Sequence, residues 1–230
     1  MMRVLLFDID GTLVLTGGAG ARAMQRAFED VFCVSGGLDS IPMAGRTDAW
    51  IVAQIAAAHG LECREEDFLR FRDTYVRYLA VEIHLPGPRK GRLPGVGALL
   101  DRLATRDDAY LALLTGNFRR GAQTKLEHFD LWRYFGTGAF GDYAHDRNGL
   151  LWDALANVEA IGGRAVRPSD VVIIGDTPLD IAVALSGGAR SLGVATGSFD
   201  VEALLASGAD MALPDLSDLD AVLEALNLAE

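Results

Sequence analysis

The sequence predicts an α/β fold, a Rossmann-like core with a parallel sheet and a small inserted α-helical domain. The first observation behind this prediction is an alternation of short apolar runs with amphipathic stretches, which is typical of parallel strands covered by helices on both faces. The second observation is one interruption of that alternation. Between residue 16 and about residue 85, three helical patterns occur without a convincing strand.

The expected elements follow from these patterns in chain order. Strands are expected at residues 4–7, 110–114, 171–174 and 192–195, with weaker ones at 138–140 and 211–213. Helices of the core are expected at 95–106, 119–128, 150–162, 178–187, 200–207 and 216–227, and helices of the insert at 19–32, 47–59 and 65–84. Local signals agree, because Thr177 followed by Pro178 is typical of a helix start.

A Pro/Gly-rich segment, residues 86–95, follows the three helical patterns and has the composition of a linker. We therefore expect two domains. The α/β core comprises residues 1–15 and 90–230, and the helical insert comprises residues 16–89.

The composition is that of a globular protein, with 50 % hydrophobic and 23 % charged residues among 230. The net charge of −11 argues against a nucleic-acid partner, which requires a basic face. Eight of the acidic residues lie after residue 190, where no Lys or Arg occurs. Most of the acidity is thus a property of the C-terminal segment, which we interpret as a solvated surface.

Other features of the sequence exclude further classes. The two cysteines, Cys33 and Cys63, lie far apart, which argues against a disulfide framework or a zinc site. No apolar run reaches the roughly 18 residues of a membrane span, and the N-terminus does not resemble a signal peptide. We expect a cytoplasmic protein without a membrane partner. The sequence leaves monomer and homodimer open.

Polar residues stand where three of the expected strands end. They are Asp8 and Asp10 after the first strand, Thr115 at the end of the second, and Asp176, followed by Asp180, after a later one. If these strands are neighbours, the side chains converge on one crevice at the carboxyl edge of the sheet. Clustered carboxylates repel one another unless a cation lies among them, and oxygen ligands suit Mg²⁺.

With the DxDGT motif at residues 8–12 and the GDxxxD motif at residues 175–180, the chain resembles phosphatases of the haloacid dehalogenase (HAD) superfamily with a helical cap, especially phosphoglycolate phosphatase-like members. The resemblance implies that Asp8 is the nucleophile that forms an aspartyl-phosphate. It implies that Asp10 is the general acid and base and binds the metal through its backbone carbonyl. Asp176 corresponds to an acidic metal ligand and Asp180 to a supporting acid.

The resemblance also implies a phosphate site. Thr115 corresponds to the hydroxyl residue that binds the phosphoryl oxygens, and we expect Gly116 and Asn117 to contact the substrate beside it. The family's basic residue is most often a Lys, but Lys90 lies in the linker and Lys125 inside a helix, so neither is expected at the site. We assign the role to Arg147, which can bind phosphate through two hydrogen bonds; the alternative is a surface arginine.

In the helical insert, Arg46 precedes Thr47, a plausible N-cap, and capped relatives carry a Gly-Arg segment that faces the substrate. We therefore expect Arg46 to contact the substrate; the alternative is a solvated arginine beside a helix start. The Arg89–Arg92 cluster is interpreted mainly as exposed linker.

The expected activity is Mg²⁺-dependent hydrolysis of a small phosphorylated metabolite, phosphoglycolate-like or a sugar phosphate. A phosphomutase similar to β-phosphoglucomutase remains the alternative. A 2-haloacid dehalogenase is disfavoured by Asp10, and a phosphonatase by the absence of Lys from residues 16–85. A non-catalytic binding protein is disfavoured because all four acids are present.

Overall fold

The computed structural model describes residues 2–36, 38, 41–143, 146–163 and 165–228. Its centre is a six-stranded sheet in the order β5-β4-β1-β6-β7-β8, in which every neighbouring pair is parallel. The strands are β1 (Arg3–Phe7), β4 (Ala109–Thr115), β5 (Thr137–Phe140), β6 (Val171–Gly175), β7 (Arg190–Val194) and β8 (Met211–Leu213). The predicted α/β class with a parallel sheet is confirmed.

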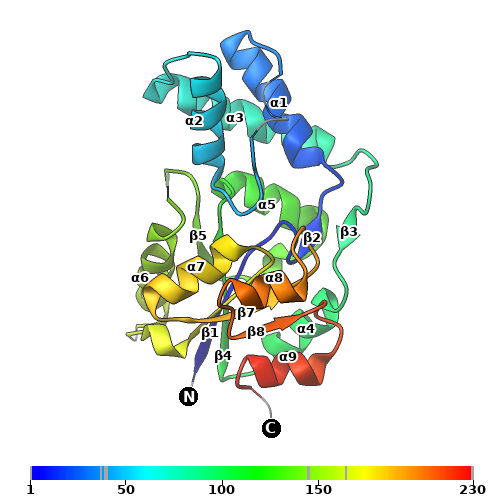
Figure 1. Ribbon diagram of the computed structural model, residues 1–230, viewed down its shortest axis with the longest axis vertical. Coiled ribbons are helices and arrows are strands. Elements are labelled where there is room, and N and C mark those ends of the chain that lie inside the picture. Colours follow the sequence, from blue (N-terminus) through cyan, green and yellow to red (C-terminus); the bar gives the residue numbers. More distant parts are fainter. Residues whose placement is uncertain (1, 37, 39–40, 144–145, 164, 229–230) are drawn as a thin grey trace.

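Helices cover both faces of this sheet (Figure 1). One face packs against α4 (Val96–Ala104), α5 (Arg119–His128) and α9 (Leu219–Ala225), and the other against α6 (Gly149–Gly162) and α7 (Pro178–Gly187); α8 (Val201–Ala206) lies beside β7 and β8. Successive side chains of a strand point to opposite faces of the sheet, so each strand contributes to both layers of packing. In β1, Leu5 and Phe7 contribute to the first layer of packing, whereas Val4 and Leu6 contribute to the second.

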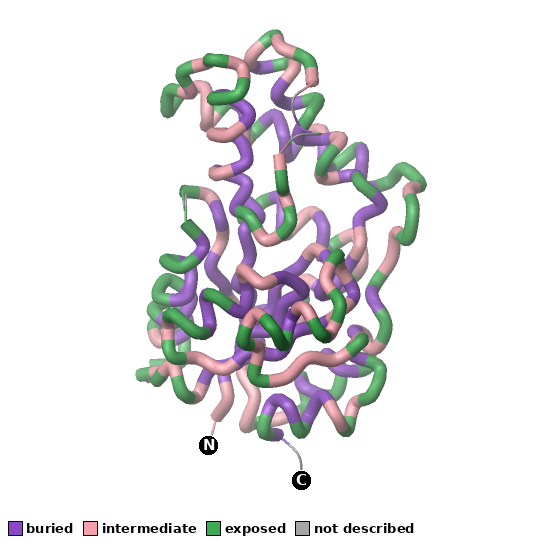
Figure 2. The backbone as a smooth tube through the Cα atoms, in the orientation of Figure 1, coloured by how far each residue is buried: buried purple, intermediate pink, exposed green. Residues whose placement is uncertain are grey.

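The helical region lies between β1 and β4 in the chain and at one end of the molecule, at the top of Figure 1. It consists of α1 (Ala19–Phe32), α2 (Asp48–Ala58) and α3 (Glu65–Glu82) and has its own apolar core, in which Phe28, Ile55, Phe71 and Leu79 are fully buried. In Figure 2, buried segments occur both in these helices and around the sheet. The expected helical insert is thus confirmed, and we call α1–α3 the helical insert below.

Two short strands connect the insert to the core, and the sequence did not predict them. β2 (Val14–Leu15) pairs antiparallel with β3 (Gly91–Arg92). Two-residue strands are too short to show a period, and β3 lies inside the Pro/Gly-rich linker. The domain boundaries at residues 16 and 89 remain a proposal.

Helix bounds differ from expectation mainly at the C-terminus. The helix expected at 216–227 begins at Leu219, because Asp218 caps it by accepting a hydrogen bond from the backbone N–H of Ala221. Short 3₁₀ turns at Trp132–Tyr134 and Pro168–Asp170 were not predicted either. Within the described residues, no helix is long and apolar enough to cross a membrane.

Candidate active site

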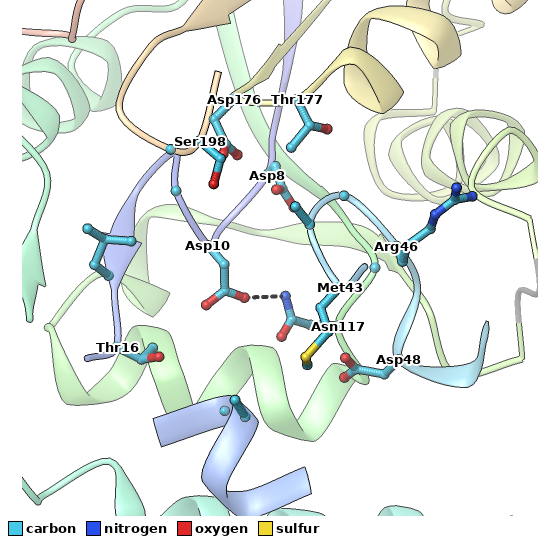
Figure 3. Close-up of a pocket in the computed structure, with 18 of the residues that line it drawn as sticks. Asp8, Asp10, Thr16, Met43, Arg46, Asp48, Asn117, Asp176, Thr177 and Ser198 are labelled. Atoms are coloured by element: carbon cyan, nitrogen blue, oxygen red, sulfur yellow. Dashed lines mark hydrogen bonds between the residues drawn. The ribbon is translucent and has the colours of Figure 1, made fainter. Parts of the chain in front are cut away.

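The central position of β1 brings the predicted strand ends together. β1 pairs with β4 on one side and with β6 on the other. Asp8 follows β1, Thr115 ends β4 and Asp176 follows β6, so all three lie at the carboxyl edge where the strand order reverses. Figure 3 shows Asp8 and Asp176 beside each other at this edge.

A cavity of about 540 Å³ lies at this edge, between the core and the helical insert. The core contributes Asp8, Asp10, Gly116, Asn117, Lys125, Arg147 and Asp176 to its wall, and the insert contributes Met24, Arg46, Asp48, Ile51 and Tyr75. The volume suits a small molecule.

Asp8 is almost completely enclosed in the cavity wall, with 5 % of its surface exposed. Burial raises the pKa of Asp8 to about 6, against the opposing charge of Arg147, and the charges of Asp180 and Asp10 raise it further. The backbone N–H of Asp8 donates to Ile174 of β6 over 2.9 Å, which fixes the residue at the strand end. A carboxylate in this setting is stabilised as an anion by added positive charge.

Asp8, Asp176 and Asp180 form a buried acidic triad, in which one oxygen from each lies within 4.8 Å of the others. Burial raises the pKa of Asp176 to about 8, and the charges of Asp180 and Asp8 add to the effect. Three crowded carboxylates with one arginine leave an excess of negative charge that a cation would neutralise. The donor set therefore fits a hard divalent ion.

The backbone around Asp176 leaves no room for larger residues. A Cβ at Gly197 would lie 1.8 Å from Asp176 Oδ2, and one at Gly11 would lie 2.3 Å from the same oxygen. Thr12 Oγ1 donates to Asp176 Oδ1 over 3.2 Å. Glycines thus form a close-fitting wall on one side of this carboxylate.

Asp180 is fully buried and does not line the cavity. Its Oδ2 accepts hydrogen bonds from the backbone N–H and the hydroxyl of Thr177. The first of these bonds belongs to the capping box at the start of α7, in which the Thr177 side chain in turn accepts from the backbone N–H of Asp180. Its Oδ1 accepts from Arg147 over 2.5 Å. The position agrees with a supporting acid, while direct metal ligation by Asp180 remains a prediction.

Arg147 reaches the site from the segment before α6 and is only 6 % exposed. Its Nη2 lies 3.0 Å from Asp8 Oδ1, and its Nη1 donates to the carbonyl of Gly45 over 2.8 Å. Burial lowers the pKa of Arg147, but the charges of Asp180 and Asp8 outweigh it and raise the pKa overall. The alternative of a surface arginine is wrong, and its binding of phosphate remains a prediction.

Asp10 lies two residues after Asp8 and faces a different part of the cavity (Figure 3). Its Oδ2 accepts hydrogen bonds from Asn117 Nδ2 over 2.9 Å and from Lys125 Nζ over 2.5 Å. The side chain is 41 % exposed. The two aspartates of the first motif therefore have separate partners, as different roles require.

The expectation that neither lysine lies at the site is wrong for Lys125. Its side chain is buried, ends in the cavity wall and forms an ion pair with Asp10. The sequence did carry a signal, because Lys125 shares the buried face of α5 with Gly121, Ala122 and Leu126. A charged residue on such a face requires a buried partner.

The three residues at the end of β4 have unequal positions. Gly116 and Asn117 line the cavity, as expected for substrate contacts, whereas Thr115 is fully buried and does not line it. Thr115 Oγ1 accepts a hydrogen bond from Asn117 Nδ2 over 2.8 Å, so its hydroxyl contacts the neighbouring side chain. Its role in phosphate binding stays a prediction.

Arg46 lines the cavity rim, but its guanidinium stacks over the Trp50 ring at 4.5 Å and points away from the aspartates in Figure 3. Thr47 is the predicted N-cap, since its hydroxyl accepts from the backbone N–H of Trp50 over 3.1 Å. Substrate contact by Arg46 remains a prediction. Arg89, placed mainly in an exposed linker, also borders the cavity and donates to the carbonyl of Thr196 over 3.1 Å.

Asp48 of the insert is a site residue that the sequence did not indicate. Its backbone N–H donates to the Gly116 carbonyl over 2.7 Å, and its Oδ2 accepts from the backbone N–H of Phe118 over 2.8 Å. Burial raises the pKa of Asp48 to about 7, although the nearby charge of Lys125 opposes this. These bonds join the insert to the core beside the cavity.

Comparison with known proteins agrees with this geometry. The HAD-hydrolase-like family model matches residues 147–219, which include Arg147 and the GDxxxD motif. No curated protein matches the sequence.

Solved structures are similar over nearly the whole chain. A hydrolase from Pseudomonas syringae is 21 % identical, with a TM-score of 0.70 and 100 % of each chain covered. β-Phosphoglucomutase from Clostridium difficile is 17 % identical, with a TM-score of 0.72, covering 99 % of this chain and 98 % of that one. A protein described as a predicted phosphoglycolate phosphatase from Haemophilus somnus is 19 % identical, with a TM-score of 0.68, covering 96 % and 97 %.

These comparisons confirm the resemblance to HAD-like hydrolases seen in the sequence. Residues 147–219 match that family model, and the solved structures share the fold, in which this chain carries a helical region between β1 and β4.

Proposed function

We propose that this protein is a phosphatase that hydrolyses a small phosphorylated metabolite, with Mg²⁺ as cofactor and an aspartyl-phosphate on Asp8 as intermediate. The observation that carries the proposal is the position of Asp8. It is a buried carboxylate at the end of the central strand, paired with Arg147 at 3.0 Å and grouped with Asp176 and Asp180. Acidic side chains that can hold a cation, together with a buried arginine, place positive charge beside Asp8, which suits an anionic phosphate ester.

In the first step, an oxygen of Asp8 attacks phosphorus, and the bond from phosphorus to the leaving oxygen breaks. In the second step, water attacks phosphorus, and the bond to Asp8 breaks to release inorganic phosphate. Covalent catalysis of this kind replaces one difficult displacement by two easier ones. Arg147, the backbone of Gly116 and the side chain of Asn117 border the space where the phosphoryl group would lie.

Asp10 is proposed as the general acid and base. It donates a proton to the leaving oxygen in the first step and takes one from the attacking water in the second, so its protonation state is restored. The 41 % exposure of its side chain into the cavity supports this role, because a carboxyl group that handles protons needs access to the reacting atoms.

The carboxylates of Asp8 and Asp176, with Asp180 behind them, would hold the divalent ion. When bound, Mg²⁺ supplies positive charge that neutralises the phosphoryl oxygens and the attacking carboxylate. The overall charge of −11 is no obstacle to an anionic substrate, since eight of the acidic residues lie after residue 190 and the cavity also contains Arg147 and Lys125.

Hydrolysis of p-nitrophenyl phosphate, measured with Mg²⁺ and with EDTA, tests the proposal. We expect turnover that requires the metal, loss of turnover in Asp8→Asn, and a phosphorylated protein trapped in acid from wild type but not from Asp8→Asn. Activity retained in Asp8→Asn would refute the covalent mechanism. A panel of about a hundred phosphorylated metabolites then identifies the substrate class.

The phosphomutase alternative shares the first step, and structures described as β-phosphoglucomutase are among the similar folds. The two activities differ in the acceptor of the phosphoryl group. Incubation with a hexose 1-phosphate distinguishes them, because a phosphatase releases inorganic phosphate and free sugar, whereas a mutase yields the 6-phosphate isomer.

A further inference from the structure

Asp10, Asn117 and Lys125 form a closed triangle of hydrogen bonds in the cavity wall. Lys125 Nζ contacts Asp10 Oδ2 and Asn117 Oδ1, both at 2.5 Å, and Asn117 Nδ2 donates to Asp10 Oδ2 over 2.9 Å. One oxygen of Asp10 thus receives two donors. Its other oxygen, Oδ1, has no hydrogen-bond partner among the described residues.

The triangle rests on rigid parts of the core. Lys125 lies in α5 with only 4 % of its surface exposed, and Asn117 follows β4 and is held by Thr115 Oγ1 at 2.8 Å. A lysine so enclosed has few alternative rotamers, and a charge-assisted bond of this length is directional. The carboxyl plane of Asp10 is therefore set by the core and does not depend on the helical insert.

Other charged and polar groups face Lys125 from the insert. Asp48 of α2 and Tyr75 of α3 lie near the ammonium group, and both favour its charged form. Burial lowers the pKa of Lys125, but the charge of Asp10, followed by those of Tyr75 and Asp48, outweighs burial and raises the pKa above its usual range. The lysine thus acts as a constant donor beside a carboxyl group whose charge changes during the reaction.

We propose that Lys125 is a positioning residue for the proposed acid and base, a role that rests on the proposed function: with Asn117 it fixes Oδ2 of Asp10, so that Oδ1 carries the proton and faces the leaving oxygen. In the first step, that proton moves from Asp10 Oδ1 to the leaving oxygen as the oxygen–phosphorus bond breaks. In the second step, a proton of the attacking water returns to Oδ1. Lys125 gives and takes no proton.

Dependence on the leaving group tests this proposal. A p-nitrophenolate ion leaves without protonation, whereas an alkoxide requires a proton in the transition state, and general acids contribute about 10² to 10⁴ in rate. In Lys125→Met we expect kcat for a simple alkyl phosphate to fall at least 30-fold, and kcat for p-nitrophenyl phosphate to fall less than about threefold. KM for both esters should change little. Substituted phenyl phosphates of graded leaving-group pKa should show a steeper dependence than in wild type.

A double-mutant cycle with Asp10→Asn separates positioning from a general structural effect. Once Asp10 can no longer donate a proton, Lys125→Met should cause no further leaving-group-dependent loss. Lys125→Arg, which keeps a cation at the position, should recover part of the alkyl phosphate activity and serves as the second variant if Lys125→Met folds poorly. Arg120→Met, an exposed position on the same helix, is the matched control and should retain the wild-type values.

Equal losses for all leaving groups, or additive losses with Asp10→Asn, would overturn the role of Lys125 while leaving the phosphatase proposal intact. Absence of metal-dependent turnover in wild type, or full activity in Asp8→Asn, would instead refute the proposed function itself. The two failures are therefore distinguishable in one set of assays.

Discussion

Nη2 of Arg147 lies 3.0 Å from Oδ1 of Asp8, and both side chains are almost fully buried. The same nitrogen also contacts Asp180 Oδ1 at 2.5 Å. An arginine shared between two buried carboxylates orients Asp8 and places a positive charge beside it. This charge lies where a phosphoryl group would gain negative charge during attack.

Arg147→Ala should lower kcat/KM for p-nitrophenyl phosphate at least tenfold, because the donors at Asp8 and the phosphoryl site are lost together. The same change leaves Asp180 buried without its cation, which typically costs about 3–5 kcal/mol of stability. Denaturant unfolding and steady-state kinetics measure the two effects. Arg147→Lys should recover stability better than activity, because it keeps the charge but cannot form the same pair of hydrogen bonds.

Arg64→Ala is the control, since the side chain of Arg64, just before α3, is 67 % exposed and pairs with Glu62 at 3.8 Å. We expect stability and kinetics within error of wild type. Wild-type activity in Arg147→Ala would remove Arg147 from the mechanism.

Removal of metal should destabilise the protein as well as inactivate it. A ligand that binds only the folded state adds about 2.7 kcal/mol at a concentration one hundred times its Kd. Wild type should therefore melt at a higher temperature in Mg²⁺ than in EDTA. In Asp176→Asn this Mg²⁺-dependent increase in Tm should disappear, because the triad loses one charged ligand.

Asp176→Asn in EDTA, by contrast, should be at least as stable as wild type, since it removes the cost of burying a charged carboxylate and its repulsion from Asp180 and Asp8. Asp153→Asn, at an exposed position of α6, controls for loss of an aspartate. An undiminished Mg²⁺ effect in Asp176→Asn would place the ion elsewhere.

Much of the core follows from the sequence because its patterns are local. Apolar runs identified the six strands of the sheet, and the rule that ligands bind at strand ends brought Asp8, Thr115 and Asp176 together. Arg147 was found because it lies in the expected interval of the chain, after Thr115 and before the GDxxxD motif. For these residues, chain order and parallel topology determine the place in the site.

Lys125, Asp48 and Tyr75 were not found because their positions depend on packing between distant segments. Lys125 reaches Asp10 only because α5 lies under the site between the sheet and α3. Asp48 reaches Phe118 only once the helical insert is seated on the core. No local period encodes how an insert docks, so Asp48 and Tyr75 were missed. Lys125 lies in the core, and the signal for it in the sequence was its place on the buried face of α5.

Gly197→Ala should impair the site although it adds only one methyl group. That Cβ would lie 1.8 Å from Asp176 Oδ2, so the carboxylate must move away from its position beside Asp8. We expect kcat/KM to fall at least tenfold and the Mg²⁺ concentration for half-maximal activity to rise, because catalytic and ligand geometry tolerates little displacement. Gly162→Ala is the matched control, since nothing lies within 4 Å of a Cβ there. Equal activity of the two variants would show that Asp176 can relocate without cost.

Asp48 should make stability depend on pH in a direction opposite to that of an ordinary salt-bridged aspartate. Its pKa is 3.8 when unfolded and about 7 when folded, chiefly because of burial. Between these values the folded chain binds a proton that the unfolded chain does not, so the free energy of unfolding falls as pH rises through this window. Above pH 7 both states are ionised at Asp48, and the loss is complete.

Asp48→Asn removes this titration while its side-chain oxygen can still accept the hydrogen bond from Phe118. Relative to wild type, the variant should therefore become more stable by about 2.7 kcal/mol between pH 5 and pH 8, because the effect extends over about two pH units up to the folded pKa, at 1.36 kcal/mol per unit. Urea unfolding of both proteins in EDTA measures the difference, in which the titrations of Asp8 and Asp176 cancel. Gly162→Ala, which adds no titrating group, should differ from wild type by the same amount at both pH values. If the difference for Asp48→Asn is likewise constant, Asp48 stays ionised across the window, and the bond that it forms with Phe118 joins the helical insert to the core with the same strength throughout.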